Sequence, residues 1–477
     1  MKVTLSGFNV DIDILRQLDP EGKALLTPET FSAAYARISR SSKSITELRR
    51  EACKDVAKAR KSNKTIIFEM GHHSVAEHAV FNFDIMGISR LCLEELEQFR
   101  LSSYTEKSQR YVTLEKDYVT PKEFKNKKII NLFQNLINKQ FTLYKTAYEK
   151  LKQYYLSKYK PNSIHQQMIK KIDGAAKEDA RYILPLAMQG QVGITFNARS
   201  LEHLFRRFKL SPRIEVQELS KKIYELVIKI APSIILFAEP SPFETKLYNS
   251  IYNEFQYIKT ENLKHLPNNF KIIAFTKNTD NIILTALLSH IKGITYDKAK
   301  QIISKLPRNK KENIYKIIFD KMQFFDAPPR EFELVDVTFQ AAISASNFAQ
   351  LKRHRIATLL LSYYDIDLGN TIPNSFDDIK LTKNFNDLIE ETNNAYIKIK
   401  QFYNNAADYI LTNSHRRLII MKMNLREIYH FVRLRADINA QWDIRNLANM
   451  LTNEVRKISP LASFMLCGKS DLPNSIH

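Results

Sequence analysis

The chain has 477 residues, more than one ordinary hydrophobic core accommodates, so at least two domains are expected. Hydrophobic residues make up 44% of the sequence, which is typical of a folded globular protein and excludes a disordered one. The formal net charge of +21 suits nucleic acid or small anionic substrates, and because the basic residues are spread along the chain, the small anions are favoured.

Several motif classes are missing from the sequence. It has only 10 glycines and no GxGxxG or GxxxxGK[ST] loop, which argues against a Rossmann or P-loop phosphate site. Cys53, Cys92 and Cys467 lack metal-ligand spacing, and an odd count fits a reducing compartment, so we expect no metal and a cytoplasmic location. The longest apolar stretch, 223–238, is interrupted by Lys229 and cannot span a membrane, and no secretion signal is recognised.

In chain order, the first half begins with a short predicted strand at 3–5 and a helix after Pro28. Residues 79–85 alternate apolar and polar side chains, which predicts a half-buried strand. A long helix follows, with one apolar stripe over 129–151. This half ends in a proline-rich stretch, after which residues 246–264 are predicted to form a connector.

The second half repeats the first. Residues 335–339 alternate like the earlier strand, and Ser344 precedes Arg355 by eleven residues as Ser89 precedes Arg100. Further matches pair 385–402 with 129–151, 407–411 with 180–184, and Asn424 with Asn197. We therefore predict two copies of one domain, at 1–245 and 265–477.

The densest group of polar functional side chains lies at 98–111, QFRLSSYTEKSQRY. Its Glu106, Ser108 and Arg110 alternate, so an extended backbone would present all three on one side. Guanidinium groups beside a hydroxyl suit a phosphate, whose oxygens arginine binds in pairs. Taken alone, such a run is more typical of a solvated charged loop.

This stretch resembles the signature of the flavin-dependent thymidylate synthases, an Arg-His-Arg triplet followed by spaced Ser, Glu, Ser and Arg-Tyr. Upstream, 71–78 (GHHSVAEH) resembles the glycine-histidine box of that family. The triplet is incomplete here, because Gln and Phe occupy 98–99 and only Arg100 remains. In the second copy 350–355 (QLKRHR) holds the full triplet, and 431–443 (FVRLRADINAQWD) resembles the family's late LRAD helix.

Each copy lacks what the other keeps. The second copy has no Glu-Ser-Arg run at 356–365, and its Asp408 stands where the first copy has Arg181, a charge reversal expected to repel an anion. The first copy has only FRRFKLSPRIEVQ, at 205–217, in place of the LRAD segment. In the family the nucleotide lies between two subunits, so the resemblance implies one composite site built from both copies. It also implies a homodimer of such chains, a pseudo-tetramer of domains.

The resemblance implies an α+β fold, helix-rich with a small antiparallel sheet in each copy. It implies conversion of dUMP to dTMP with methylenetetrahydrofolate as carbon donor, NADPH as reductant and FAD as redox carrier. Arg435 would stabilise the anion of the uracil ring. The three catalytic candidates implied are Arg435, Arg181 and Ser108. The residues implied to bind dUMP are Gln350, Arg353, Glu106, Ser108, Gln109, Arg110, Arg181 and Arg435. Those implied to bind FAD are Ser74, Glu106, Arg353, His354, Arg355, Asn424, Arg426 and His430, and His72 is implied to serve folate.

Other interpretations stay open at this point. A degenerate paralogue could bind flavin or nucleotide without turnover, and a related flavin- and folate-dependent enzyme could act on another uracil, for example in RNA. His72 is alternatively a polar turn residue. Asn197 and Arg199 of the first copy are expected to be structural remnants, and Trp442 is expected to belong to the core rather than to a ligand site.

Overall fold

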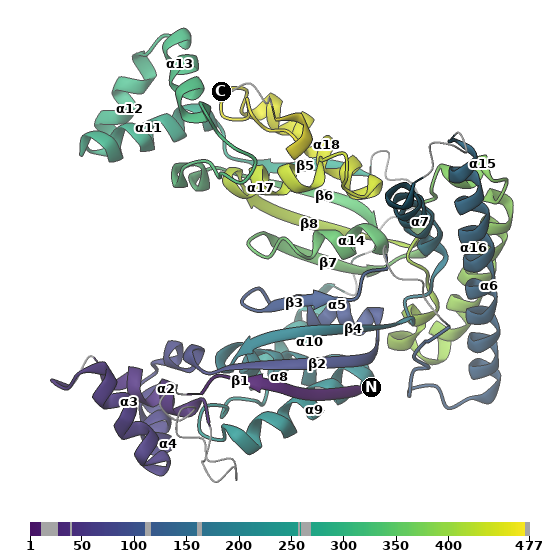
Figure 1. Ribbon diagram of the computed structural model, residues 1–477, viewed down its shortest axis with the longest axis horizontal. Helices are drawn as coiled ribbons and strands as arrows, with labels where there is room; N and C mark the ends of the chain where they lie inside the picture. The colour runs from purple at the N-terminus through teal and green to yellow at the C-terminus, as the bar shows by residue number, and fades with distance from the viewer. Residues whose placement is uncertain are drawn as a thin grey trace. The chain divides into compact units, whose positions relative to one another are not determined.

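The computed structural model describes residues 1–10, 27–38, 41–109, 116–159, 165–255, 258 and 269–472 (Figure 1). The chain divides into two compact units. The first unit comprises Met1–Glu261 with Ser375–Thr412, and the second comprises Asn262–Asn374 with Asn413–His477. Each unit is helix-rich and contains one small antiparallel sheet, which confirms the predicted fold class. Within the described ranges, no helix combines the length and the apolar character needed to cross a membrane.

The sheet of the first unit has the strand order β1-β2-β4-β3. Its strands are β1 (Lys2–Phe8), β2 (Val80–Ser89), β3 (Ser103–Glu106) and β4 (Gln189–Asn197). Every neighbouring pair is antiparallel. The alternation predicted at 79–85 is confirmed, since Phe81, Phe83 and Ile85 are fully buried on one face of β2.

The sheet of the second unit has the same order, β5-β6-β8-β7 (Figure 1). Its strands are β5 (Phe270–Phe275), β6 (Asp336–Ser344), β7 (Thr358–Tyr364) and β8 (Arg416–Asn424). The pairing register also matches, because Ser89 lies opposite Gln189 while Ser344 lies opposite Arg416. The two sheets therefore confirm the internal repeat. They differ at Gly87, whose φ of 71° accommodates a bulge in β2 that β6 lacks.

Corresponding helices follow the strands of the two sheets. In the first unit these are α5 (Arg90–Leu96), α8 (Ala198–Lys209) and α9 (Ile214–Ile230), and in the second α14 (Ala345–Leu351), α17 (Leu425–Arg435) and α18 (Trp442–Ile458). Ser89 and Ser344 cap the starts of α5 and α14 with their hydroxyls. The same hydroxyls donate to carboxylates at the starts of α9 and α18, at 2.6 Å from Glu215 and 2.6 Å from Asp443. Each sheet is thereby fixed to its own helices by an equivalent bond.

The long helices of both copies pack together in the first unit. They are α6 (Lys127–Ser157), α7 (Gln166–Ala180) and η5 (Arg181–Ile183) of the first copy, with α15 (Ser375–Asp378), α16 (Thr382–Phe402) and η8 (Asn404–Ile410) of the second. The buried Gln140 amide donates to the carbonyl of Ile410 at 2.9 Å and to the Thr392 hydroxyl at 3.2 Å. The predicted domains follow the sequence repeat and stay a prediction, whereas packing assigns 375–412 to the first unit.

The remaining elements are divided between the two units. In the first unit they are α2 (Glu29–Arg37), α3 (Ile45–Lys54), α4 (Val56–Asn63), the π-helix η2 (Lys64–Glu69), the 3-10 helix η3 (His73–His78) and α10 (Pro242–Phe255). In the second they are α11 (Thr279–Lys292), α12 (Tyr296–Lys305), α13 (Arg308–Phe319), η6 (Arg330–Leu334), η7 (Ile366–Leu368) and η9 (Lys469–Asp471). Helix α10 occupies the first part of the predicted connector, so that part is helical.

Candidate functional site

In the second unit, Arg435 lies at the end of α17 and is held at three points. Its Nε donates to Nε2 of His354 at 2.9 Å, and its two terminal nitrogens donate to the side-chain and main-chain oxygens of Gln350, each at 3.2 Å. Gln350 and His354 are buried, whereas Arg435 is half-buried. Three residues predicted from the resemblance are therefore brought together in one unit.

The hydrogen bond to Arg435 determines the proton position on His354. An arginine Nε–H can only donate, so Nε2 of His354 must accept and the ring proton sits on Nδ1. Nδ1 lies 3.5 Å from a carboxylate oxygen of Glu427, which is buried on the same helix as Arg435. Burial, together with the positive charge of Arg435, holds the pKa of His354 well below its usual range, so the ring is neutral. Burial also raises the pKa of Glu427.

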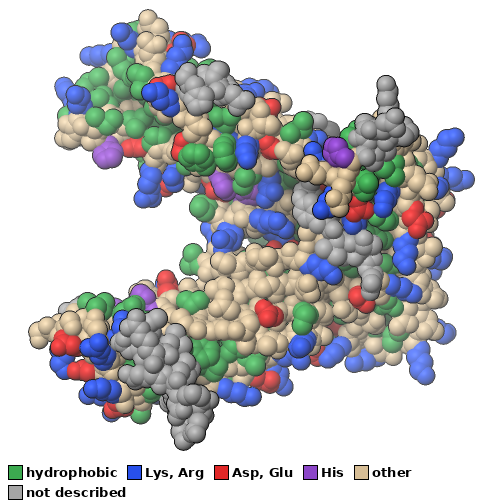
Figure 2. All heavy atoms as spheres, viewed as in Figure 1, with side chains coloured by type: hydrophobic (Ala, Val, Ile, Leu, Met, Phe, Trp, Pro, Cys, Tyr) green, Lys and Arg blue, Asp and Glu red, His purple; other side chains and the backbone are tan. Residues whose placement is uncertain are grey.

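The two arginines of the triplet, Arg353 and Arg355, are placed where they could bind an anion. Arg353 and Arg355 flank the buried His354 and are both exposed, which leaves two guanidiniums accessible to a ligand. His430 is exposed on α17, with its ring centre 5.7 Å from that of His354. Figure 2 shows that Lys and Arg side chains are otherwise scattered over the visible surface, with acidic side chains among them.

Asn424 and Arg426, predicted to bind flavin, make bonds that the first copy repeats. Asn424 caps α17 by accepting from the Glu427 amide at 2.8 Å, and Arg426 pairs with Glu333 at 3.1 Å. In the first copy Asn197 caps α8 through the amide of Ser200 at 2.8 Å, and Arg199 pairs with Glu77 at 2.6 Å. Because both copies have this arrangement, these bonds serve the fold of each copy.

In the first unit, Glu106 is the last residue of β3 and lies in a buried cluster of charges. A terminal nitrogen of Arg90 is 3.5 Å from the Glu106 carboxylate, and Nε of Arg90 is 3.8 Å from that of Glu94. All three side chains are almost completely buried. Arg90 and Glu94 were not singled out in the sequence as site residues. Their spacing of four residues on one helix face was the available signal.

The residues after Glu106 are only partly described. Ser108 and Gln109 are half-buried, and the Gln109 amide lies 4.0 Å from the sulfur of Met188. Arg110 lies outside the described residues. Arg181 begins η5 and is buried, with 2% of its surface exposed.

The predicted folate and flavin residues of the glycine-histidine box lie at the surface. His72 precedes η3 and Ser74 lies in its first turn, and both side chains are exposed. Their exposure at a 3-10 turn is compatible with ligand contact. For His72 it is equally compatible with the simpler role of a polar turn residue.

The first copy replaces the His354–Arg435 pair with two aromatic residues. Arg435 is the eleventh residue after its helix cap, and Phe208 is the eleventh residue after the cap of α8. Phe99 stands at the triplet position of His354, and its ring centre lies 5.6 Å from that of Phe208. A charged hydrogen bond in one copy is thus an apolar contact in the other, which accounts for the missing half-site.

The second copy shows the converse replacement. Sheet register places Leu361 opposite Ile419 as Glu106 is placed opposite Val192, so Leu361 corresponds to Glu106. Ala345 begins α14 as Arg90 begins α5, and Ala349 is four residues further on, where the first copy has Glu94. The buried charge cluster of the first copy is therefore replaced by small and apolar side chains.

Asp408 does not present an isolated negative charge. Its carboxylate lies 2.8 Å from the guanidinium of Arg213, which also pairs with Glu95 at 2.5 Å. All three belong to the first unit. The repulsion of an anion expected from the sequence is therefore reduced locally by Arg213, whose charge Asp408 shares with Glu95.

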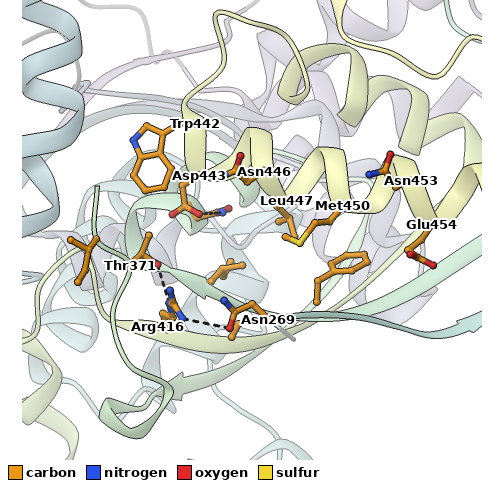
Figure 3. Close-up of a pocket in the computed structure, with 15 residues that line it drawn as sticks. Asn269, Thr371, Arg416, Trp442, Asp443, Asn446, Leu447, Met450, Asn453 and Glu454 are labelled. Atoms are coloured by element: carbon orange, nitrogen blue, oxygen red, sulfur yellow. Dashed lines mark hydrogen bonds between the residues drawn. The ribbon is translucent and has the colours of Figure 1, made fainter. Parts of the chain in front are cut away.

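The second unit also has a cavity of about 730 Å³ between α18 and the β5–β6 edge (Figure 3). Its arginine, Arg416, donates from Nε to the Thr371 hydroxyl at 2.9 Å, and its Asp443 accepts from Asn347 at 2.9 Å. These bonds connect β8 and α18 to neighbouring loops and helices. Trp442 lines the cavity and is half-exposed, so the expectation that it is a core residue is wrong. None of the residues predicted to bind dUMP or FAD lines this cavity.

Among the described residues, no group of three or more histidine, cysteine, aspartate or glutamate side chains is arranged to hold a metal ion.

Comparison with known proteins identifies the family. The family model described as thymidylate synthase complementing protein matches residues 24–233 and 271–461, which together exceed half of the chain. The chain belongs to the flavin-dependent thymidylate synthase family. The two matched segments correspond to the two copies and confirm the long form with tandem domains.

Individual relatives match either both copies or a smaller part of the chain. The UPF0159 protein Ta1429 of Thermoplasma acidophilum is 22% identical over 442 residues, covering 83% of this chain and 86% of that protein. The flavin-dependent thymidylate synthase of Clostridium tetani is 29% identical, covering 45% and 83%, and that of Pyrococcus abyssi is 34% identical, covering 34% and 60%. Among solved structures, the Helicobacter pylori enzyme complexed with FAD and dUMP is 18% identical, covers 47% and 93%, and gives a TM-score of 0.32.

Proposed function

We propose that this family member is an active thymidylate synthase that converts dUMP to dTMP with FAD, methylenetetrahydrofolate as carbon donor and NADPH as reductant. We further propose that each chain has one composite site, to which each copy contributes one half. One observation carries this proposal: each copy retains one buried polar cluster and has apolar residues where the other copy has its cluster. Random decay would have removed parts of both clusters from both copies.

The proposed roles divide between the copies. From the second copy, Arg435 and Gln350 would contact the uracil ring, and Arg353 the 5′-phosphate. From the first copy, Arg181 would contact the ring, while Ser108, Gln109 and Arg110 would hold the phosphate and sugar. Glu106 would orient these groups and contact flavin or ribose.

The exposed arginines fit an anionic cofactor. Arg353 and Arg355 present two accessible cations on either side of a neutral histidine, which suits the pyrophosphate of a dinucleotide without a glycine loop. His430, Asn424, Arg426 and Ser74 would supply further contacts. FAD, when bound, supplies the hydride-carrying chemistry, and His72 would serve the folate.

The contribution of the chain's own residues is electrostatic and positional. Bond formation at C5 of uracil requires negative charge to develop in the ring, and a fixed guanidinium stabilises that charge. Arg435 suits this task because three hydrogen bonds to His354 and Gln350 fix its orientation before substrate arrives. Ser108 is also a nucleophile in principle, but we assign it to phosphate binding.

A direct assay tests the proposal. Purified protein is incubated with FAD, dUMP, methylenetetrahydrofolate and NADPH, and dTMP is measured by chromatography. We expect dTMP formation that depends on added FAD. A protein that binds FAD and dUMP but forms no dTMP would contradict the activity and support a non-catalytic paralogue.

We also propose a cytoplasmic homodimer of two-copy chains. All three cysteines lie in the described part of the chain and none forms a disulfide, which suits a reducing compartment. Two chains would rebuild a four-domain assembly.

A further inference from the structure

We propose that His354 is a positioning residue that holds Arg435 for the uracil ring, and that Glu427 keeps the imidazole in the tautomer this requires. This inference deepens the proposed function, on which its activity readout rests. It assigns His354 a role in orienting the catalytic arginine in addition to any contact with FAD.

The geometry defines a line of three side chains. Glu427 faces Nδ1 of His354 at 3.5 Å, and Nε2 of the same ring accepts from Arg435 at 2.9 Å. Glu427 and Arg435 are eight residues apart on α17, so they share one face of the helix. The imidazole comes from the segment after α14 and is edge-on to Phe431, with ring centres 4.8 Å apart. The ring is hydrogen-bonded to the arginine, whereas its buried Nδ1 makes no hydrogen bond among the described residues and lies close to the acid, which acts on it through its charge.

The tautomer is essential to this arrangement. If Nε2 carried the proton, two N–H groups would face each other and the bond to Arg435 would be lost. A carboxylate opposite Nδ1 favours the proton on that side, as orienting carboxylates do for other histidines. The charged and titratable groups around the ring are Arg435, His430 and Glu427 from α17, with Arg353 next to it in the chain. Burial first, and then the surrounding positive charge, lowers the pKa of His354 and keeps the ring neutral.

The first copy supports the inference because it lacks all three members. Counting from the helix caps and the triplet, Ser200, Phe99 and Phe208 occupy the positions of Glu427, His354 and Arg435. The two phenylalanines pack against each other. Joint absence of the three residues is expected if they serve one task, since a buried histidine or carboxylate without its partners destabilises a core.

The test compares His354→Phe, the residue of the first copy, with His354→Gln, whose amide oxygen can still accept from Arg435. The Nε–H signal of Arg435 is followed by ¹H–¹⁵N NMR in protein labelled at arginine and is assigned with Arg435→Lys. We expect a solvent-protected signal in the wild type and in His354→Gln, and loss of protection in His354→Phe. His203→Phe is the matched control, because His203 contacts Arg206 at 2.9 Å in the first copy and should leave the signal unchanged.

The second part of the test measures kcat and KM for dTMP formation. We expect His354→Phe to lower kcat about ten- to a hundredfold with a smaller change in KM, and His354→Gln to recover most of the loss. Because His354 would act through Arg435, the double variant His354→Phe/Arg435→Ala should be no slower than Arg435→Ala alone. A double variant whose loss of kcat equals the product of the two single losses would overturn the positioning role. A protected Arg435 signal in His354→Phe would overturn it as well. A wild type inactive on dUMP would contradict the proposed function, while the NMR arm would still decide the role of His354.

Discussion

At the scale of single residues, Arg435 is the side chain on which the proposed chemistry depends most. Its guanidinium is fixed by Gln350 and His354 and is half-buried, so its charge acts in a less polar environment than water. Its match in the first copy, Phe208, cannot stabilise an anion. The first copy's arginine next to it, Arg207, donates instead to the side chain of Gln98.

We predict that Arg435→Ala lowers kcat about a hundredfold or more while FAD stays bound, because one fixed charge at the ring is lost. The matched control is Arg207→Ala, on the corresponding helix of the first copy, which should change turnover little. The measurements are dTMP formation and flavin absorbance after gel filtration. Equal losses of turnover in the two variants would show that the active half was assigned to the wrong copy.

His354 gives the protein a predicted dependence on pH. Its pKa is lowered in the folded state, whereas in the unfolded chain it takes up a proton near pH 6.5. Below about pH 6.5 the unfolded state therefore binds more protons, and stability falls as the pH falls, by up to about 1.4 kcal/mol per pH unit for this residue. His354→Phe lacks this contribution.

We therefore expect the deficit in melting temperature of His354→Phe, relative to the wild type, to be smaller at about pH 5.5 than at about pH 7.5. Differential scanning calorimetry of both proteins at each pH measures it. A deficit that is constant or grows on acidification would mean that the pKa of His354 is not lowered in the folded protein.

At the scale of elements, the edge strands β3 and β7 carry the difference between the copies. Glu106 ends β3 with a buried carboxylate against Arg90, while β7 has Leu361 at the same register. Buried ion pairs contribute little net stability, but removal of one partner leaves an unpaired charge. The cluster is therefore better explained by a site than by stability.

The charged cluster of the first copy can be replaced by the apolar residues of the second copy. We predict that Glu106→Leu alone lowers the free energy of unfolding by about 1–3 kcal/mol, since the buried Arg90 loses one of its two carboxylates and keeps the more distant Glu94, at 3.8 Å. The triple variant Arg90→Ala/Glu94→Ala/Glu106→Leu, with the composition of the second copy, should recover most of that stability and still form no dTMP. Urea denaturation and the dTMP assay measure the two effects. A triple variant that is active would exclude this cluster from the site.

The sequence predicted these elements better than it predicted their contacts. The alternation at 79–85 and the stripe at 129–151 specify a strand and a helix locally, and both are present as β2 and α6. The bond from Arg435 to His354 joins residues 81 positions apart, and only the packing of α17 beside the triplet creates it. The family motif pointed to both residues but not to their bond, and it gave no indication of Glu427.

At the scale of the whole molecule, sequence repeat and packing divide the chain differently. The repeat suggests boundaries near 245 and 265, whereas residues 375–412 of the second copy pack within the first unit. Burial of the apolar stripe of α16 against α6 accounts for this, since each long helix needs a partner face. Sequence similarity shows which copy a segment derives from. It does not show that the segment packs within the unit formed mainly by the other copy.

The tandem arrangement also predicts where the halves combine. We expect Arg110 and Arg353 of the same chain to serve one nucleotide, so Arg110→Ala and Arg353→Ala should each be inactive. Co-expression of the two variants should leave the mixture inactive, because every site then carries a lesion. Recovered activity would mean that the halves come from different chains, since some sites would then contain neither lesion.

Counting bound nucleotide tests whether the two copies together supply one site per chain. Equilibrium dialysis of FAD-loaded protein against labelled dUMP gives the number of sites per chain. We predict one dUMP per chain in the wild type, and loss of binding both in Arg110→Ala of the first copy and in Arg353→Ala of the second. Two dUMP per chain, or binding that survives either substitution, would contradict it.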